Sequence, residues 1–567
     1  MFRALSWVAV LSLASASPAR AQSPPPQPAR DRPAAPAATG TAAVRGRVVD
    51  AATGRGLSKV QVRANTNTSG PPPTPYPWMA TTDANGRYEI TGIPAGTYAI
   101  AATKPNYVRA AYGAERVEGP GKRMILTDGQ VLDKIDLKLS RTGAITGNIV
   151  DEFGDPVTDV SVSAMRYQYV QGSRRLMPSG RGGSTNDIGE YRIYGLTPGQ
   201  YYVSAVLRNF GGGMQSETTD RSTYAPTFYP GTGNVADAQR LTIAPGQTAT
   251  AINLGLLPIQ AAKISGRAMD AAGQPLSNVM INVMQRLGSA MVNNSAVPIG
   301  PDGKFTLSLT PGDYYLRVFG NATQGATTEL TVTGADIDDL QLMVLKPSLI
   351  RGRIAFTDSA AGAAPPKPTA IDLGAWREWM IGQPVRSAAK IKDDGTFEIS
   401  LQPGHVLLRG AVSGPPPSGP AAAPWRLNRV LQNDLDISDI GLDVPANATI
   451  ENIVFEMTDH SSPVSGRITD AEGKTVRDCF VIVFAQDPTH WTVQTRHLSV
   501  SRPGLDDLFH TRLLAGDYYA VAMSDVEPNA WTDPEFLSLA REHATKFSIA
   551  DGESRTIDLV VTAAPVF

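Results

Sequence analysis

The chain has 567 residues, of which 42% are hydrophobic, and its 51 basic and 53 acidic residues give a formal net charge of −2. This near-neutral balance gives no electrostatic case for nucleic acid or an acidic membrane surface as a partner. The 53 glycines and 44 prolines are typical of many short strands joined by turns. The single cysteine, Cys479, allows no internal disulfide, and its apolar setting DCFVIVF predicts a buried strand residue.

The beginning of the chain has the pattern of an export signal. A basic residue, an apolar run over residues 4–14 and the small-residue site Ala19-Arg20-Ala21 predict a signal peptide over residues 1–21. Residues 22–42 are rich in Pro and Ala and predict an extended linker. No later segment reaches the roughly 20 apolar residues of a membrane helix. We therefore expect an exported protein without a transmembrane segment, located in the periplasm, at the cell surface or outside the cell.

One pattern returns along the chain: an Asp-Gly turn, an alternating strand, a Pro-Gly or Ala-Gly break, and a strand that opens with tyrosine. Its copies are DANGRYEITGIPAGTYAIAA (83–102), DIGEYRIYGLTPGQYYVSA (187–205), DGKFTLSLTPGDYYLRV (302–318), DGTFEISLQPGHVLLRG (394–410) and a degraded FHTRLLAGDYYAVA (509–522). We expect Tyr98, Tyr201, Tyr314 and Tyr518 to point inward, with each hydroxyl bonded to a backbone group at a sandwich corner. The fourth copy has Val406 at this position.

Two further signatures bracket each copy. A strand with an internal glycine comes first, as VRGRVVD, ITGNIVD, ISGRAMD, IRGRIAF and VSGRITD, and its glycines are 101, 119, 86 and 114 residues apart. The glycine predicts close approach of a neighbouring backbone. A strand, a polar turn and an alternating strand come last, as in MILTDGQVLDKIDLKL and FSIADGESRTIDLVV. The spacing is that of one small sandwich domain per repeat.

These signatures predict an all-β protein of five tandem antiparallel Greek-key β-sandwich domains, with about seven strands in each, in an elongated array. A single helix is expected within DPEFLSLAREHA, where Asp533 can cap it. The predicted domains, called units below, cover residues 43–141, 142–260, 261–347, 348–459 and 460–567.

The order G-x-[IV]-x-D, G-x-P-[LV], T-D-x-x-G-x-[YF] and L-x-P-G-x-Y resembles the carboxypeptidase regulatory-like domain. That family is a transthyretin-like β-sandwich, also grouped with carbohydrate-binding-like folds. The resemblance extends from Ala43 over the mature chain; it is weaker in the fourth unit, which has Val406, and weakest in the fifth, which lacks the Asp-Gly turn. It implies a fold and an exported setting but no reaction.

The residues do not form a known catalytic pattern. None of the histidines lies in an H-x-x-E or H-E-x-x-H motif, and neither a G-x-S-x-G elbow nor a phosphate loop is present. The protein is therefore expected to be no enzyme and to have no catalytic residue, cofactor or metal. The fifth unit carries His490, His497 and His510, which could meet across strands as a metal site, but ordinary surface or hydrogen-bonded histidines are the preferred interpretation. An enzymatic site would have to form between units.

Binding is the remaining class of function. We expect it at the variable segment between the second strand and the Asp-Gly turn of each unit. Aromatic residues in these segments are proposed to bind a ligand: Tyr76, Trp78, Trp376, Trp379 and Trp491. Such rings could stack on sugars or pack against a protein, or they could simply cover their own domain. The partner is expected to be a glycan or, alternatively, an envelope protein docked on a structural scaffold.

Overall fold

The computed structural model describes residues 40–66, 78–114, 117–119, 121–170, 172–207, 222–287, 290–321, 324–359, 364–377, 389–413, 425–504, 506–524 and 526–565. Strands dominate these residues, and the chain folds into tandem β-sandwich domains. Among the described residues, no helix has the length and apolar character needed to cross a membrane.

The first three units contain the following strands. Unit 1 has β1 (Ala42–Asp50), β2 (Gln61–Thr66), β3 (Met79–Thr81), β4 (Arg87–Ile93), β5 (Gly96–Thr103), β6 (Ala110–Ala111), β7 (Arg123–Leu126), β8 (Val131–Leu132) and β9 (Leu137–Leu139). Unit 2 has β10 (Gly143–Val150), β11 (Val160–Val170), β12 (Ser173–Ser184), β13 (Glu190–Leu196), β14 (Gly199–Leu207), β15 (Ser222–Ala225), β16 (Thr227–Phe228), η1 (Val235–Asp237), β17 (Leu241–Ile243), β18 (Thr248–Ala249), β19 (Leu254–Gly255) and β20 (Leu257–Gln260). Unit 3 has β21 (Ala262–Met269), β22 (Met280–Leu287), β23 (Ala290–Pro298), β24 (Lys304–Leu309), β25 (Gly312–Asn321), β26 (Gln324–Val332) and β27 (Ile337–Met343).

The last two units repeat this order of elements. Unit 4 has β28 (Ser348–Phe356), η2 (Pro368–Ala370), β29 (Ile371–Trp376), β30 (Lys390–Ile391), β31 (Thr396–Leu401), β32 (Gly404–Val412), β33 (Arg426–Gln432), β34 (Leu435–Asp436), β35 (Leu442–Val444) and β36 (Thr449–Thr458). Unit 5 has β37 (Ser462–Thr469), β38 (Phe480–Ala485), η3 (Pro488–His490), β39 (Leu498–Ser501), β40 (Leu508–Leu513), β41 (Gly516–Ser524), η4 (Ala530–Thr532), α1 (Pro534–Ala540), η5 (Arg541–His543), β42 (Thr545–Ile549), β43 (Arg555–Thr556) and β44 (Leu559–Ala563). Asp533 caps α1 as expected, by accepting a hydrogen bond from the backbone N–H of Glu535 at 2.8 Å.

Three strand pairings recur in every unit: the first strand with the strand after the turn, the second strand with the strand after the Gly break, and the first strand with the closing strand. In unit 1, β1 pairs antiparallel with β4 in one sheet, and β2 pairs antiparallel with β5 in the facing sheet. Each sheet therefore contains one strand from before the Asp-Gly turn and one strand from after it. The final strands β8 and β9, however, run parallel to β1. The sheets are therefore mixed and not purely antiparallel as expected. The final strand reaches β1 by crossing from the other sheet, so no hairpin dictates its direction.

The glycine inside the first strand of each unit lies against a neighbouring backbone, as predicted. A Cβ atom placed on Gly147 would stand 1.8 Å from the carbonyl oxygen of Ile252, and one on Gly46 would stand 2.0 Å from that of Ile135. These separations are far below van der Waals contact. Any side chain here would push the closing strand away from the first strand.

The predicted tyrosine corner is confirmed in four units. The hydroxyl of Tyr201 donates to the carbonyl of Thr197 at 2.6 Å, and that of Tyr314 donates to the carbonyl of Thr310 at 2.8 Å. The other two pairs are Tyr98 to Pro94 and Tyr518 to Leu514, both at 3.0 Å. All four rings are buried.

The fourth unit uses a different group at this corner. Val406 replaces the tyrosine, and the guanidinium of Arg377 donates instead to the carbonyls of Gln402, the equivalent position, and Pro403. Burial, followed by the nearby Arg317, lowers the pKa of Arg377. A long cationic side chain from the neighbouring strand end thus satisfies the carbonyl that a tyrosine satisfies elsewhere.

Each unit has its own hydrophobic core between its two sheets. The five core clusters fall within residues 42–139, 145–256, 262–344, 350–457 and 464–559. Cys479 is buried in the last of them, as expected, and burial raises the pKa of its thiol to about 11.

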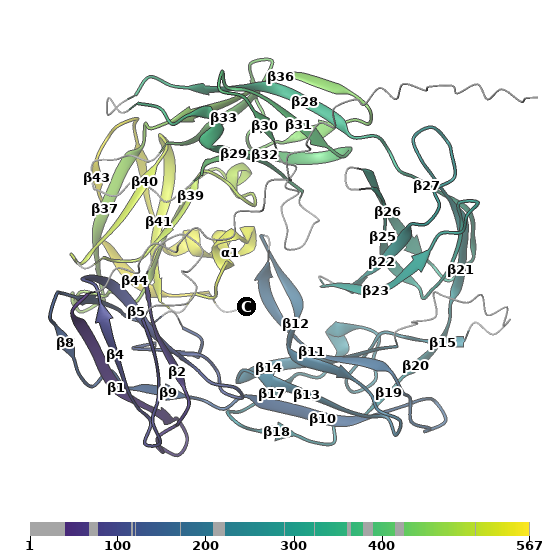
Figure 1. Ribbon diagram of the computed structural model, residues 1–567, viewed down its shortest axis with the longest axis horizontal. Coiled ribbons are helices and arrows are strands. Elements are labelled where there is room, and N and C mark those ends of the chain that lie inside the picture. Colours follow the sequence, from purple (N-terminus) through teal and green to yellow (C-terminus); the bar gives the residue numbers. More distant parts are fainter. Residues whose placement is uncertain are drawn as a thin grey trace, which may run out of the picture.

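The units follow one another around a ring (Figure 1) and not along an elongated array. A long β11–β12 hairpin of unit 2 reaches across the ring to unit 5 (Figure 1). The sequence predicts this segment as a variable loop. Tyr169 on this hairpin is 5% exposed and meets Phe536 of α1 edge-on, with ring centroids 6.4 Å apart. These two residues belong to a sixth apolar cluster shared by units 2 and 5. Unit 5 also lies beside unit 1, where Arg123 is close enough to Arg502 for the repulsion to lower its pKa, after burial as the main cause.

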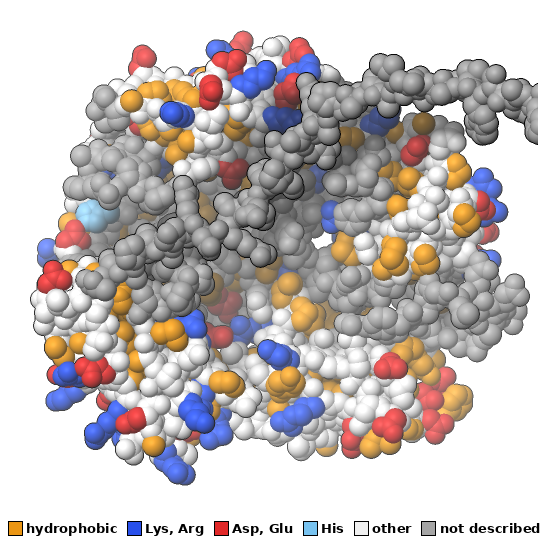
Figure 2. Space-filling view, in the orientation of Figure 1, with side chains coloured by type: hydrophobic (Ala, Val, Ile, Leu, Met, Phe, Trp, Pro, Cys, Tyr) orange, Lys and Arg blue, Asp and Glu red, His pale blue; other side chains and the backbone are white. Residues whose placement is uncertain are grey.

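The described side chains on the visible face of the ring carry charges of both signs (Figure 2). Figure 2 shows acidic and basic side chains interspersed over the described surface, with hydrophobic side chains between them. This distribution agrees with the formal net charge of −2. It gives no support for a polyanionic partner.

Candidate functional site

The tryptophans proposed to bind a ligand belong to three different units. Tyr76 and Trp379 lie outside the described residues. Trp78 is half-buried; its indole N–H donates to the carbonyl of Gly92 at 3.0 Å, and its ring packs edge-on against Tyr98 at 5.7 Å. These contacts tie the ring to the core of its own unit.

Trp491 and Trp376 have different surroundings. Trp491 is 8% exposed, donates from its indole N–H to the carbonyl of Ala485 at 2.8 Å, and packs against Phe484 in the apolar cluster shared by units 2 and 5. The ring therefore presents little surface to a ligand. Trp376 is half-buried at the end of β29, opposite Leu407 of β32. The structure does not bring these rings together into one platform.

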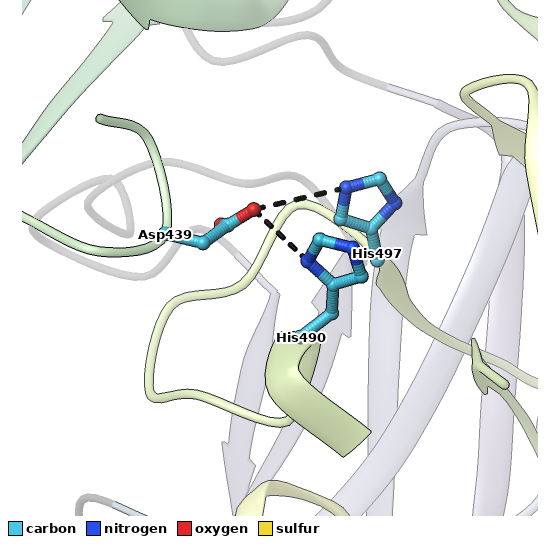
Figure 3. Close-up of side chains that lie close together, drawn as sticks. All are labelled: Asp439, His490 and His497. Atoms are coloured by element: carbon cyan, nitrogen blue, oxygen red, sulfur yellow. Dashed lines mark hydrogen bonds and ion pairs between the residues drawn. The ribbon is translucent and has the colours of Figure 1, made fainter. Parts of the chain in front are cut away.

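A cluster of titratable side chains does converge, at the junction between units 4 and 5. We call Asp439, His490 and His497 the junction cluster (Figure 3). Asp439 follows the short strand β34 of unit 4, whereas the two histidines flank the segment between η3 and β39 of unit 5. In Figure 3 the carboxylate of Asp439 points toward both imidazole rings.

Local hydrogen bonds position these side chains. Asp487 caps η3 by accepting from the backbone N–H of Thr489 at 2.9 Å, which sets the turn that presents His490. On the other side, Asp436 accepts from the backbone N–H of Ser438 at 2.9 Å and fixes the turn before Asp439. Both contributions to the cluster therefore come from short turns that their own sequences stabilise.

The donors and acceptors of the cluster centre on one carboxylate oxygen. Asp439 Oδ2 is 3.1 Å from His490 Nδ1, 4.0 Å from His497 Nε2 and 3.3 Å from Arg496 Nη2. The same Nη2 atom of Arg496 is also 3.3 Å from Asp436 Oδ2. The ring centroids of His490 and His497 lie 4.4 Å apart.

The protonation state of His497 follows from its neighbours. Because the hydroxyl of Tyr518 donates to the carbonyl of Leu514, its oxygen accepts from His497 Nδ1, 3.2 Å away. Burial above all, and then Arg496 and His490, lower the pKa of His497 to about 4. The ring is therefore neutral near pH 7, and its Nε2 atom carries a lone pair that faces Asp439. Two acceptors thus face each other across 4.0 Å.

Several buried polar atoms around the cluster have no hydrogen-bond partner in the described part of the chain. They are Asp439 Oδ1, Arg496 Nε, Arg409 Nη2 and Thr492 Oγ1. The side chain of Asp439 is 10% exposed. The two arginine nitrogens are donors, whereas Asp439 Oδ1 is a buried acceptor, and burying it without a partner is costly.

Sequence reasoning found part of this cluster. It placed His490 and His497 among histidines that could meet across strands, and the structure brings these two together. His510 instead bonds Asp506 at 2.7 Å on an exposed surface. Asp439 was missed, because the segment DISDIGLD has the composition of an ordinary turn and the contact joins two separate units.

Comparisons with known proteins identify the first unit. Residues 43–139 match the family described as the carboxypeptidase regulatory-like domain. The first unit is therefore similar to the carboxypeptidase regulatory-like domain. The other four units share with this domain the pairing of the first strand with the strand after the turn, and a glycine inside the first strand. No curated protein matches the chain.

The chain is also similar to solved structures of bacterial proteins. The Bacillus anthracis TIE protein shares 11% identity, over 89% of this chain and 75% of that one, with a TM-score of 0.15. A streptococcal ancillary pilin shares 14% identity, over 54% of this chain and 99% of that one, with a TM-score of 0.18. The minor pilin GBS52 of Streptococcus agalactiae shares 14% identity, over 39% and 97%, with a TM-score of 0.21. Scores at this level carry no argument about function.

Proposed function

We propose that the protein is an exported, non-enzymatic scaffold whose ring of sandwich units docks a protein of the cell envelope. The observation that carries this proposal is the closed arrangement of five separately cored units, held by the packing of Tyr169 against Phe536. Such a body presents several loop ends in fixed relative positions, which suits recognition of a large partner.

Unit 4 offers an exposed apolar segment beside the junction cluster. Leu435 and Ile440 are 62% and 63% exposed, and both lie on the segment that carries Asp439. Large exposed apolar side chains are a common feature of protein interfaces. This segment is our candidate for the docking surface.

A photo-cross-linking residue in place of Ile440, in cells that make the protein, tests the docking surface. We expect one envelope protein to be captured repeatedly at this position. The same residue in place of Ile188, 55% exposed on a turn of unit 2, serves as the matched control and should not capture it. Equal capture at both positions, or none at position 440, would contradict the docking surface.

Glycan binding is a second candidate, which Trp376 favours because its half-buried ring ends a strand without closing a core. The test is retention of the purified chain on a panel of glycans and cell-wall polysaccharides. Retention that Trp376→Ala abolishes, while Phe153→Ala leaves it intact, would support a sugar site; Phe153 is 83% exposed in unit 2. Folded protein that binds no glycan would remove this candidate and leave the docking scaffold.

A further inference from the structure

We propose that Asp439, His490 and His497 bind one divalent transition-metal ion, of the Zn²⁺ type, between units 4 and 5. The three potential ligand atoms are Asp439 Oδ2, His490 Nδ1 and His497 Nε2, and all lie within 4.8 Å of one another. Two imidazole nitrogens and one carboxylate oxygen form a ligand set that first-row transition metals use widely. Hard cations such as Ca²⁺ prefer a larger set of oxygen ligands.

The hydrogen bonding of His497 supports a cation at this position. Its Nδ1 atom donates to Tyr518, so Nε2 is the free acceptor that faces Asp439 Oδ2 across 4.0 Å. A lone pair opposite a carboxylate oxygen is unfavourable unless a positive charge lies between them. Metal bonds of about 2.0–2.2 Å from each atom span this separation after small side-chain movements. Tyr518 thereby serves as the outer partner that orients the imidazole.

The burial of Asp439 gives independent support. Its side chain is only 10% exposed, and its Oδ1 atom has no hydrogen-bond partner in the described part of the chain. A metal that binds Oδ2, alone or together with Oδ1, compensates the negative charge of this buried carboxylate. Three protein ligands leave a further coordination position for water.

Two arginines near the cluster oppose a cation, and the structure shows how each is compensated. Arg496 Nη2 is equally close to Asp436 and Asp439, so its charge can stay with Asp436 when a metal takes Asp439. Arg409 donates to the carbonyls of Ser438 at 2.6 Å, Gln494 at 3.0 Å and Leu408 at 2.9 Å. These bonds place the charge at Nε and Nη1 on backbone oxygens, while Nη2 has no hydrogen-bond partner in the described part of the chain.

The metal would join two consecutive units, each with its own hydrophobic core. Asp439 belongs to unit 4 and both histidines belong to unit 5, so binding requires the junction to be formed. By linkage, an ion that binds only the assembled junction stabilises the junction. The inference does not depend on whether the scaffold docks a protein or a glycan.

Calorimetric titration of the untagged chain with Zn²⁺, after treatment with a chelator, tests the site. We expect one tightly bound equivalent, and we expect Co²⁺ to give the visible absorption of a four- or five-coordinate nitrogen and oxygen site. Asp439→Asn and His490→Asn should each weaken Zn²⁺ binding by at least about tenfold. His510→Asn, on an exposed surface of the same unit, should leave binding unchanged.

Loss of binding through misfolding is separated from loss of a ligand by the near-UV circular dichroism of each variant. His490 is 34% exposed, so His490→Asn is the variant that least disturbs packing. Zn²⁺ should raise the thermal unfolding midpoint of the wild type and of His510→Asn, but not that of a folded His490→Asn. Folded wild-type protein that binds no Zn²⁺, or binding that survives both cluster substitutions, would overturn the proposal.

Discussion

At the scale of single residues, the repeated glycine of the first strand shows how a sequence pattern reports on a contact distant in sequence. Gly147 and Ile252 are 105 residues apart, yet the carbonyl of Ile252 occupies the space where a side chain would begin. The close approach lets the final strand pair with the first, which places Leu254 and Ile145 in one core. The glycine is therefore required by packing and not by turn geometry.

Gly147→Ala should destabilise unit 2 by about 1–3 kcal/mol, because the closing strand must move away to make room for the methyl group. Hydrogen exchange of the amides in β10 and β13 measures this loss as a smaller free energy of local opening. Gly255→Ala is the matched control, since a Cβ there meets no atom within 4 Å. Equal protection in the two variants would show that the backbone contact is easily relaxed.

At the scale of the element, the turn that enters the tyrosine strand needs a donor for one buried carbonyl, and the donor can come from two directions. In units 1, 2, 3 and 5 it is a hydroxyl on the strand itself. In unit 4 it is the guanidinium of Arg377, which arrives from the end of the adjacent strand β29. The sequence showed that the tyrosine was missing but not what replaced it, because Arg377 and Gln402 meet only through strand pairing.

Arg377→Met should destabilise the corner of unit 4 by about 1–3 kcal/mol, because it leaves the carbonyls of Gln402 and Pro403 without their donor. Val406→Tyr in the same background should restore part of the loss by supplying the hydroxyl found in the other units. Hydrogen exchange in β32 reports both effects. Arg351→Met on β28 removes exposed ion pairs with Glu398 and Glu451 and should change stability by less than about 1 kcal/mol. Failure of Val406→Tyr to restore any protection would argue against the equivalence of the two donors.

At the scale of the whole molecule, the ring depends on a contact between units that are not neighbours in sequence. The β11–β12 hairpin of unit 2 reaches unit 5, where Tyr169 joins Phe536 and Leu537 of α1 in a buried cluster. Burial raises the pKa of Tyr169 to about 12, as expected for a hydroxyl removed from water. Trp491 lies in the same cluster, which accounts for its low exposure.

Tyr169→Asp should open the ring, because it places an unpaired charge in an apolar contact at a cost of several kcal/mol. Small-angle X-ray scattering should then show a larger radius of gyration and a longer maximum dimension than for the wild type. Ile188→Asp, at an exposed turn of the same unit, should leave both quantities unchanged. A compact Tyr169→Asp protein would mean that the remaining contacts hold the ring closed without this residue.

The sequence by itself determined the repeated sandwich, the close approach at the strand glycines and the tyrosine corners, because each depends on contacts within one repeat whose pattern recurs along the chain. It did not determine the parallel pairing of the final strands, the ring or the junction cluster. The ring and the cluster join residues from different units, such as Tyr169 with Phe536 and Asp439 with His490. Only the tertiary structure decides such contacts, since the relative orientation of folded units depends on which surfaces fit together and leaves no periodic signal in the chain.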